Sequence, residues 1–201
     1  MLKAFLTIAG AYLIGAIPTA FLAGRLLKGI DIRQVGSGNI GATNVFRSIG
    51  KTAGVGVLAI DMFKGVIPVL LAAQLAPGSC IETFRILAGL AAVCGHIWTI
   101  FLGFKGGKGV ATSTGVLLTL APASTLSAFA VFVLVVTITR YISLGSIIAA
   151  STVPLLVWYL NPGQIELFYF VLVMAILIDL KHIPNIKRLI NHEEHKFSFK
   201  K

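Results

Sequence analysis

Charged side chains are scarce in this 201-residue chain, where Asp, Glu, Lys and Arg together make up 12% of the residues. A soluble domain carries about 25% charged residues. Hydrophobic residues reach 57% and the mean hydropathy is +0.93. This composition excludes a water-soluble enzyme, a disordered tail and a nucleic-acid-binding arm. It predicts an integral membrane protein surrounded by lipid, with no nucleic acid among its partners.

Carboxylates and cysteines are even rarer. The seven acidic residues form no paired-carboxylate site, and no Ser-His-Asp order or metal cluster stands out, so we expect neither a metal nor a cofactor. Cys80 and Cys94 are too few for a disulfide framework, and neither has metal-ligand spacing to a histidine. The sequence therefore favours chemistry based on bound phosphates and electrostatic stabilisation over acid-base pairs.

Long apolar runs with few charges predict an all-α membrane protein. A span needs about 20 helical residues, and none of the runs alternates as barrel strands do. The first run is long enough to be a retained span and not a signal peptide. The predicted helices are Ala4 to Gly24, Ala53 to Ile81, Ile86 to Phe104, Val110 to Ala121, Ser124 to Thr139, Tyr141 to Ile165 and Leu167 to Ile178.

The positions of the basic residues predict the topology. Most of the 17 lysines and arginines follow the first, third and last runs, which places those segments in the cytoplasm by the positive-inside rule. The turns at Pro77 to Ser79 and Asn161 to Gln164 carry no positive charge and belong outside. An odd number of crossings must then separate Lys108 from Asn161, and Pro122 divides the long run to give three.

The topology prediction is about seven transmembrane helices, one of them short, with the N-terminus outside and the C-terminus in the cytoplasm. Five or six spans with one misassigned loop is the alternative. We expect residues 1–201 to form a single transmembrane catalytic domain.

The first cytoplasmic segment, Gly36 to Arg47, is rich in glycine and small polar residues. Glycines let the backbone approach a ligand closely, and Ser37 and Asn39 resemble caps of a helix that starts nearby. Backbone donors at such a helix start could face an anion with Arg47 beside it. The candidate ligand-binding residues of this segment are Ser37, Asn39, Thr43, Asn44 and Arg47. A flexible interhelical loop is the alternative.

The second cytoplasmic segment interleaves glycines with lysines. Lys105, Gly106, Gly107 and Lys108 offer bare backbone N–H groups and two positive charges, which suit a phosphate. The spacing is not that of a Walker loop, so we predict phosphate or phosphoester binding without nucleotide hydrolysis. Simple positive-inside anchoring is the alternative for the lysines. His96, at the end of a predicted span, is either a base or an interfacial hydrogen-bonding group.

Two further groups of residues are candidates for the site. Asp61 and Lys64 lie three apart on one face of a predicted helix, and Lys64 is the better candidate to meet an anion, although a mutually neutralised structural pair is a serious alternative. In the third cytoplasmic segment a helix opening at Pro184 would place Asn185 and Arg188 on one face, with His182 just before it. A basic amphipathic tail on anionic lipid is the alternative there.

These three segments resemble the three motifs of the bacterial acyl-phosphate:glycerol-3-phosphate acyltransferases, the PlsY family. The residues that match these motifs are Gly36 to Asn44 with Arg47, Gly95-His96 with Phe104 to Thr112, and His182 with Asn185 to Leu189. The third motif departs from the family pattern at His192, where the family has glycine. Asp61 to Gly65 also resembles a polar patch of the family.

The resemblance implies a multi-pass protein of the bacterial inner (cytoplasmic) membrane, with its active site on the cytoplasmic face. Its reaction would transfer a fatty acyl group from acyl phosphate to the 1-hydroxyl of sn-glycerol 3-phosphate, giving lysophosphatidic acid and phosphate, without acyl-CoA, acyl carrier protein or metal. This is the first acylation step of phospholipid synthesis. By position, the resemblance assigns Ser37 and Arg47 to the active site and Gly106 to Lys108 to glycerol 3-phosphate. It assigns His182 and Asn185 to activity and gives Glu194 a structural role.

In our mechanistic hypothesis the candidate residues bind the phosphates of the two substrates and the reacting carbonyl. Ser37 and Asn185 would hydrogen-bond around the carbonyl or hydroxyl, and the proton would pass to the acyl phosphate, with His96 or His182 as the competing base. The substrate-binding candidates are Asn39, Thr43, Asn44, Arg47, Lys64, Lys105, Gly106, Gly107, Lys108, Thr112 and Arg188.

Two rival functions fit part of the sequence, and no obligate protein partner is evident. A transporter of a phosphorylated small solute would need a polar path to the outer face, which the sequence hardly offers. A phosphatidyl-alcohol transferase would need clustered aspartates for a metal.

Overall fold

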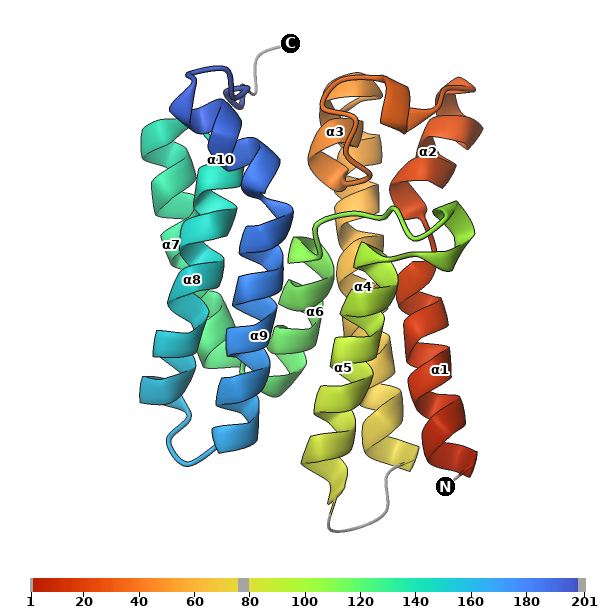
Figure 1. Ribbon diagram of the computed structural model, residues 1–201, viewed down its shortest axis with the longest axis vertical. Helices are drawn as coiled ribbons and strands as arrows, with labels where there is room; N and C mark the ends of the chain where they lie inside the picture. The colour runs from red at the N-terminus through yellow and green to blue at the C-terminus, as the bar shows by residue number, and fades with distance from the viewer. Residues whose placement is uncertain (1, 76–79, 199–201) are drawn as a thin grey trace. The chain divides into compact units, whose positions relative to one another are not determined.

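The computed structural model describes residues 2–75 and 80–198, and the regular structure in these ranges is helical. The chain divides into two compact units, Met1–Thr119 and Leu120–Lys201. The first unit holds the six helices labelled α1 to α6 in Figure 1 and two short 3-10 turns. Their bounds are α1 Leu2–Ala16, α2 Thr19–Lys28, η1 Ile32–Gln34, α3 Ala42–Ser48, α4 Lys51–Leu75, α5 Ile81–Ile97, η3 Ile100–Leu102 and α6 Val110–Leu120.

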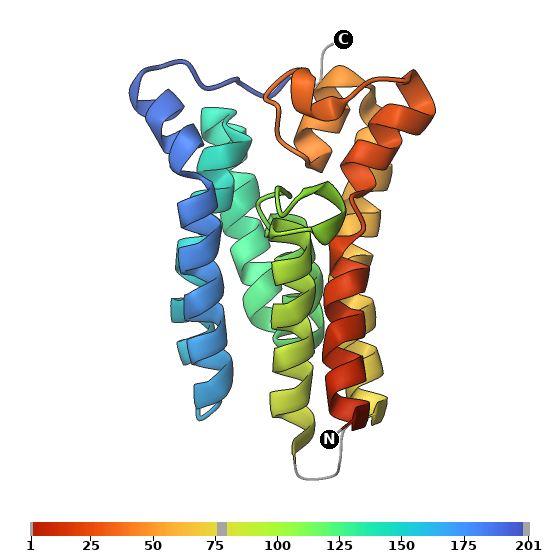
Figure 2. The same ribbon diagram turned by 45° about the vertical axis from the view of Figure 1, so that its right-hand side comes forward.

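Small residues let the long helices of the first unit approach closely. Figures 1 and 2 show α1, α4 and α5 side by side, with α2 and α3 gathered at the end away from the N-terminus. A Cβ on Gly15 would collide with the backbone of Ala92, and one on Gly95 with the carbonyl of Tyr12. Contacts of this kind drive helix association in lipid, where apolar burial alone does not. They fix α1 against α5.

The second unit is a three-helix bundle with a short terminal helix. It consists of α7 (Pro122–Thr139), α8 (Ile142–Leu160), α9 (Ile165–Lys181) and α10 (Ile183–Ile190). Helix α8 packs against both α7 and α9. The segment after α10 returns to the corner between α7 and α8, where the Phe197 N–H donates to the Arg140 carbonyl at 2.7 Å.

The prediction of an all-helical membrane protein with one short helix is confirmed. Five described helical stretches are long and apolar enough to span a membrane, and α9 with α10 makes a sixth, bent by 54°. The short apolar helix is α6, Val110–Leu120, as predicted from Pro122. Which end faces the cytoplasm stays a prediction, as does the single catalytic domain, and the turn at Pro77 to Ser79 lies outside the described residues.

Several details of the predicted helices were wrong. Ile81, predicted to end the second helix, is the first residue of α5, which was predicted to begin at Ile86. The first span, predicted as unbroken from Ala4 to Gly24, is interrupted at Ile17 and Pro18. Proline lacks the N–H that would continue the ladder, so the break could have been predicted from Pro18. The third helix ends at Ile97 and not at Phe104, because the chain turns there into η3. Ser37 and Asn39 cap no helix: α3 begins at Ala42, with Gly41 as its N-cap residue.

Candidate functional site

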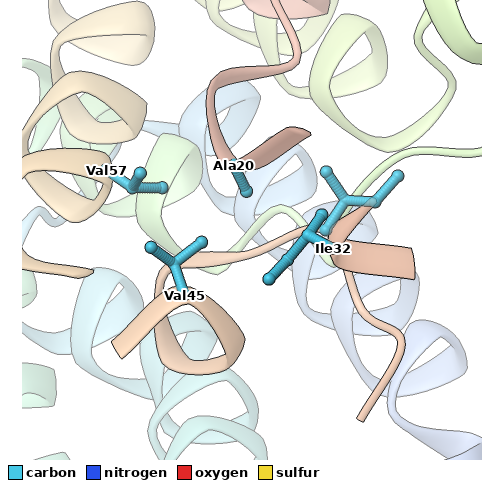
Figure 3. Close-up of a cluster of buried hydrophobic side chains, with 5 residues drawn as sticks. Ala20, Ile32, Val45 and Val57 are labelled. Carbon is cyan, nitrogen blue, oxygen red and sulfur yellow. The ribbon is translucent and has the colours of Figure 1, made fainter. Parts of the chain in front are cut away.

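The glycine-rich segment after α2 is anchored by a small apolar core. Ala20, Ile32, Ile40, Val45 and Val57 are each at most 6% exposed and form one cluster, drawn in Figure 3. Its members come from α2, η1, α3, α4 and the loop itself. Burial of these side chains holds the loop against three helices, so the polar residues between them have fixed positions.

Asn44 ties the backbone of this loop together. Its side chain is 1% exposed, and its Nδ2 donates to the carbonyls of Ile32, Val35 and Asn39 at 3.0, 3.0 and 3.1 Å. Its Oδ1 accepts from the Ser37 N–H at 3.0 Å. The amide therefore satisfies backbone groups that the irregular loop leaves without secondary-structure partners. These contacts make Asn44 a residue that shapes the loop.

The other candidates of the first segment surround this anchor. Ser37 is exposed, and its Oγ accepts a long hydrogen bond of 3.5 Å from the Asn39 N–H. Asn39, Thr43 and Arg47 are partly buried. The exposed Ser37 hydroxyl lies directly beside the backbone that Asn44 holds, so the loop presents it to solvent from a defined position.

The Gly-Lys segment folds back onto the end of α5. The Gly106 N–H donates to the Ile97 carbonyl at 3.1 Å and the Gly107 N–H to the His96 carbonyl at 3.0 Å. A Cβ on Gly107 would collide with His96 Nε2 and lie 2.7 Å from the Ile40 carbonyl. The two predicted motifs therefore touch at Gly107 and Ile40. Lys105 is exposed on one side of this turn and Lys108 is partly buried on the other.

A buried polar cluster lies below the Gly106–Gly107 turn. Lys64 Nζ is 2.6 Å from Asp61 Oδ1, and both side chains are at most 5% exposed. His96 Nδ1 lies 4.0 Å from the same oxygen. The three residues and both glycines line a small pocket of about 10 Å³. The geometry favours the alternative that Asp61 and Lys64 neutralise each other.

Thr112 differs from the other candidates of the second segment. It is 0% exposed in the first turn of α6, and its carbonyl lies against Gly65 of α4. Its Oγ1 has no hydrogen-bond partner among the described residues. This burial supports a role in packing α6 on α4 more than direct contact with a substrate.

The third segment is organised by Glu194 within the second unit. Its carboxylate accepts from Ser143 Oγ and Asn185 Nδ2 at 2.8 Å each, and from Arg188 Nε at 2.7 Å. His182, 2% exposed, donates from Nδ1 to the Ile178 carbonyl at 2.8 Å. These contacts support the structural role that the resemblance implies for Glu194, and they fix the side chains of Asn185 and Arg188.

Asp31 is a residue of the first unit that the sequence analysis missed. It accepts from the Arg33 N–H at 3.0 Å and from Arg33 Nη2 at 2.6 Å, just before the glycine-rich loop. These hydrogen bonds from Arg33 lower the pKa of the Asp31 carboxyl to about 2. The Asp-x-Arg spacing was the available signal, and it belongs to a capping contact at η1.

Sequence comparisons agree with the resemblance. The family model described as Glycerol-3-phosphate acyltransferase matches residues 5–192. The chain belongs to the glycerol-3-phosphate acyltransferase (PlsY) family. It is 50% identical over 190 residues to the Glycerol-3-phosphate acyltransferase of Trichlorobacter lovleyi, covering 94% of this chain and 95% of the relative. The same protein of Geobacter sulfurreducens is 48% identical over 197 residues, covering 98% and 99%.

Solved structures of the PlsY family match as well. The crystal structure of PlsY (YgiH), an integral membrane glycerol 3-phosphate acyltransferase in its glycerol 3-phosphate form, has a TM-score of 0.87 and 38% identity, covering 97% of this chain and 96% of that one. Its lysophosphatidic acid form has a TM-score of 0.86 at the same identity. Family membership decides between the enzyme and the transporter in favour of the enzyme.

The Glu194 contacts of this PlsY family member predict a loss of stability in acid. Burial raises the pKa of the Glu194 carboxyl, but the hydrogen bonds that it accepts outweigh burial, so its pKa lies below the usual value. A carboxyl whose pKa is lower in the folded state stabilises the protein above its unfolded pKa. This contribution disappears as the pH falls through the folded pKa.

We expect Glu194→Gln to lower the thermal midpoint at pH 7 by about 5 °C, because hydrogen bonds to a carboxylate contribute about 1.5–3 kcal/mol. The difference from wild type should begin to shrink as the pH falls below the pKa of an unperturbed glutamate, about 4.3, and vanish as the pH passes below the lowered pKa of the folded Glu194 carboxyl. Thermal unfolding followed by fluorescence across this range measures both effects. Glu193→Gln, at the exposed neighbouring position, is the control. Equal midpoints for the two variants would contradict the assignment.

Proposed function

We propose that this chain transfers a fatty acyl group from acyl phosphate to the 1-hydroxyl of sn-glycerol 3-phosphate, releasing phosphate and forming lysophosphatidic acid, the first acylation step of phospholipid synthesis. The observation that carries the proposal is the contact between two glycine-rich loops at Gly107 and Ile40, with lysines on either side of the Gly-Gly turn. The related PlsY was crystallised in glycerol 3-phosphate and lysophosphatidic acid forms, which supports the same acceptor and product here.

We assign phosphate binding to the cations beside the glycine-rich segments. Lys105 and Lys108 flank the Gly106–Gly107 turn, whose N–H groups donate to the Ile97 and His96 carbonyls, and Arg47 follows the neighbouring loop. An arginine binds phosphate through two parallel N–H groups, whereas a lysine acts as a point charge. We therefore assign glycerol 3-phosphate to the Gly106 to Lys108 turn. Arg47 is our candidate for the acyl phosphate.

Acyl phosphate is already activated, so the protein mainly orients the hydroxyl and stabilises developing charge. In the proposed reaction the 1-oxygen of glycerol 3-phosphate forms a bond to the acyl carbon, and the bond from that carbon to the phosphate oxygen breaks. The hydroxyl proton passes to the departing phosphate. Ser37, which is exposed, is the proposed hydrogen-bond donor to the carbonyl.

The geometry of the histidines supports a proton path through the substrate. His96 is 9% exposed, with Nδ1 facing Asp61 and Nε2 against Gly107. His182 is 2% exposed and donates from Nδ1 to a helix carbonyl. A general base must come within hydrogen-bond reach of the proton it removes. The burial of His96 and of His182 does not favour direct access to the substrate hydroxyl. Both histidines are better suited to holding neighbouring groups in place.

We propose the bacterial cytoplasmic membrane as the location, with the site on its inner face. In the first unit, α2, α3 and the start of α4 carry Arg25, Lys28, Arg47 and Lys51 at one end. An excess of lysine and arginine is typical of the cytoplasmic side. Glycerol 3-phosphate would reach this face from water, and the acyl chain would stay in the bilayer.

The donor assignment is tested with purified protein in nanodiscs, glycerol 3-phosphate labelled with ¹⁴C, and palmitoyl phosphate, palmitoyl-CoA or palmitoyl-acyl carrier protein. We expect labelled lysophosphatidic acid and one phosphate per acyl transfer with palmitoyl phosphate alone. Product from palmitoyl-CoA but not from palmitoyl phosphate would overturn the donor. No product from any donor would overturn the function. Boiled protein controls for spontaneous acyl transfer.

A further inference from the structure

The break in the first span exposes two backbone carbonyls inside an apolar stretch. Helix α1 ends at Ala16 and Pro18 supplies no N–H. A carbonyl without a partner is costly in a membrane. The Ala16 carbonyl accepts from the Thr99 hydroxyl. The Ile17 carbonyl accepts from the Thr19 N–H at 2.9 Å and from Lys64 Nζ at 2.6 Å. A charged side chain from α4 thus holds the break in place.

A buried ion pair is a costly source of one hydrogen bond to a single backbone carbonyl, that of Ile17. Taking Lys64 and Asp61 out of water carries a desolvation penalty that their attraction only partly offsets, and apolar residues often serve stability equally well. Ionisable residues inside a membrane span are functional candidates by default. Stability alone therefore does not explain why Asp61 and Lys64 form a buried ion pair here. The best-attested reason for such pairs is that they fix a specific geometry.

The residues around the pair indicate which geometry is fixed. Asp61 Oδ1 contacts Lys64 Nζ at 2.6 Å and lies 4.0 Å from His96 Nδ1. The carbonyl of His96 accepts the Gly107 N–H at 3.0 Å, and its ring lies where a Gly107 side chain would be. Pro18, Lys64 and Gly107 line the same pocket. His96 therefore lies between the ion pair and the Gly106–Gly107 turn, and Lys64 of the pair contacts the break at the Ile17 carbonyl.

We propose that Lys64 is a positioning residue: by holding the Ile17 carbonyl at the break of the first span, its ammonium keeps Asp61, His96 and the Gly106–Gly107 turn in the arrangement that binds glycerol 3-phosphate. This inference rests on the proposed function for the identity of the ligand. Lys64 acts through the turn, without touching the substrate, which distinguishes it from Lys105 and Lys108.

The test compares variants that differ only at Lys64. Asp61→Asn preserves the shape of residue 61 and leaves the Lys64 nitrogen able to donate to Ile17. Lys64→Met in the Asp61→Asn background also removes the nitrogen, without leaving an unpaired carboxylate. We expect KM for glycerol 3-phosphate to be at least tenfold higher in the double variant than in Asp61→Asn, which is the reference because it keeps the Lys64 nitrogen. KM for palmitoyl phosphate should change less than twofold in both.

A parallel rise of both KM values, or equal KM values for glycerol 3-phosphate in the two variants, would overturn the proposal, because a merely structural pair has no reason to affect one substrate selectively. If the double variant does not fold, Lys64→Gln in the same background replaces it. Its amide is shorter than lysine by one bond, and we expect at least a threefold rise in the same KM. No rise would overturn the proposal.

Amide hydrogen exchange separates this inference from the reaction itself. Without any substrate, peptides covering residues 104–109 should exchange at least fivefold faster in the double variant than in Asp61→Asn, because the Gly106 and Gly107 amides lose their fixed acceptors. Unchanged exchange would overturn the positioning role even if the enzyme is active. Faster exchange in a protein that forms no lysophosphatidic acid would support the positioning role and count only against the proposed function.

Discussion

Gly107→Ala is expected to lower kcat/KM for acyl transfer about 100-fold or more, since a displacement of about 1 Å in a substrate-positioning element can have this effect. The added methyl group would collide with His96 Nε2 and approach the Ile40 carbonyl to 2.7 Å, so either the Gly-Lys turn or the neighbouring loop must move. Overpacking of this kind typically costs about 1–3 kcal/mol, which the fold should survive. Activity is therefore expected to suffer far more than stability.

Steady-state kinetics with palmitoyl phosphate and glycerol 3-phosphate, together with a thermal midpoint, measures this separation. Gly56→Ala is the matched control, because Gly56 lies within α4 and a Cβ there meets nothing within 4 Å. We expect that control to match wild type in kcat/KM and to unfold at the same or a slightly higher temperature. Wild-type kinetics for Gly107→Ala would show that the contact between the two loops is unimportant.

Asn44→Asp should have the largest combined effect on stability and activity. The change is nearly isosteric, but it replaces a donor that serves three backbone carbonyls with an oxygen that repels them. Leaving these buried acceptors unpaired costs about 1–3 kcal/mol, and an ionised carboxylate adds to that penalty. We expect the thermal midpoint to fall by about 10 °C at pH 7.5. Activity should fall at least 100-fold as the backbone at Ser37 loses its position.

Asn191→Asp, at an exposed position after α10, is the control for the added negative charge. It should leave both quantities unchanged. The result that would contradict the role of Asn44 is a variant that loses activity while keeping its wild-type midpoint. That outcome would favour direct contact between Asn44 and a substrate over the shaping of the loop.

Much of the fold follows from local properties of the sequence. A helix in lipid pairs its own backbone groups, so an apolar run of sufficient length already determines an element of this fold. The short helix before Pro122 was predicted from that proline, which lacks the N–H that continues a helix, although Pro68 and Pro154 lie inside α4 and α8. The break at Pro18 carried the same signal, but the apolar run continues through it and hides the interruption from a hydropathy argument.

The candidate site was predicted less completely than the fold. Glycines alternating with lysines indicated a phosphate-binding turn, because the required chemistry lies in neighbouring residues. Lys64 and Glu194 were harder to interpret. Their partners include Ile17 and Ser143, far away in the sequence, and neither spacing nor composition reveals such pairs.

Apolar length and motif composition are local properties, and they suffice to identify a helical membrane protein of the glycerol-3-phosphate acyltransferase family. Which polar residues organise the loops and which are presented to solvent depends on how the helices and loops pack. Asn44 and Ser37 occur in the same motif, yet one is 1% exposed with its amide bonded to the loop and the other is exposed. That difference arises because a buried polar group must find a partner, and packing decides which groups are buried.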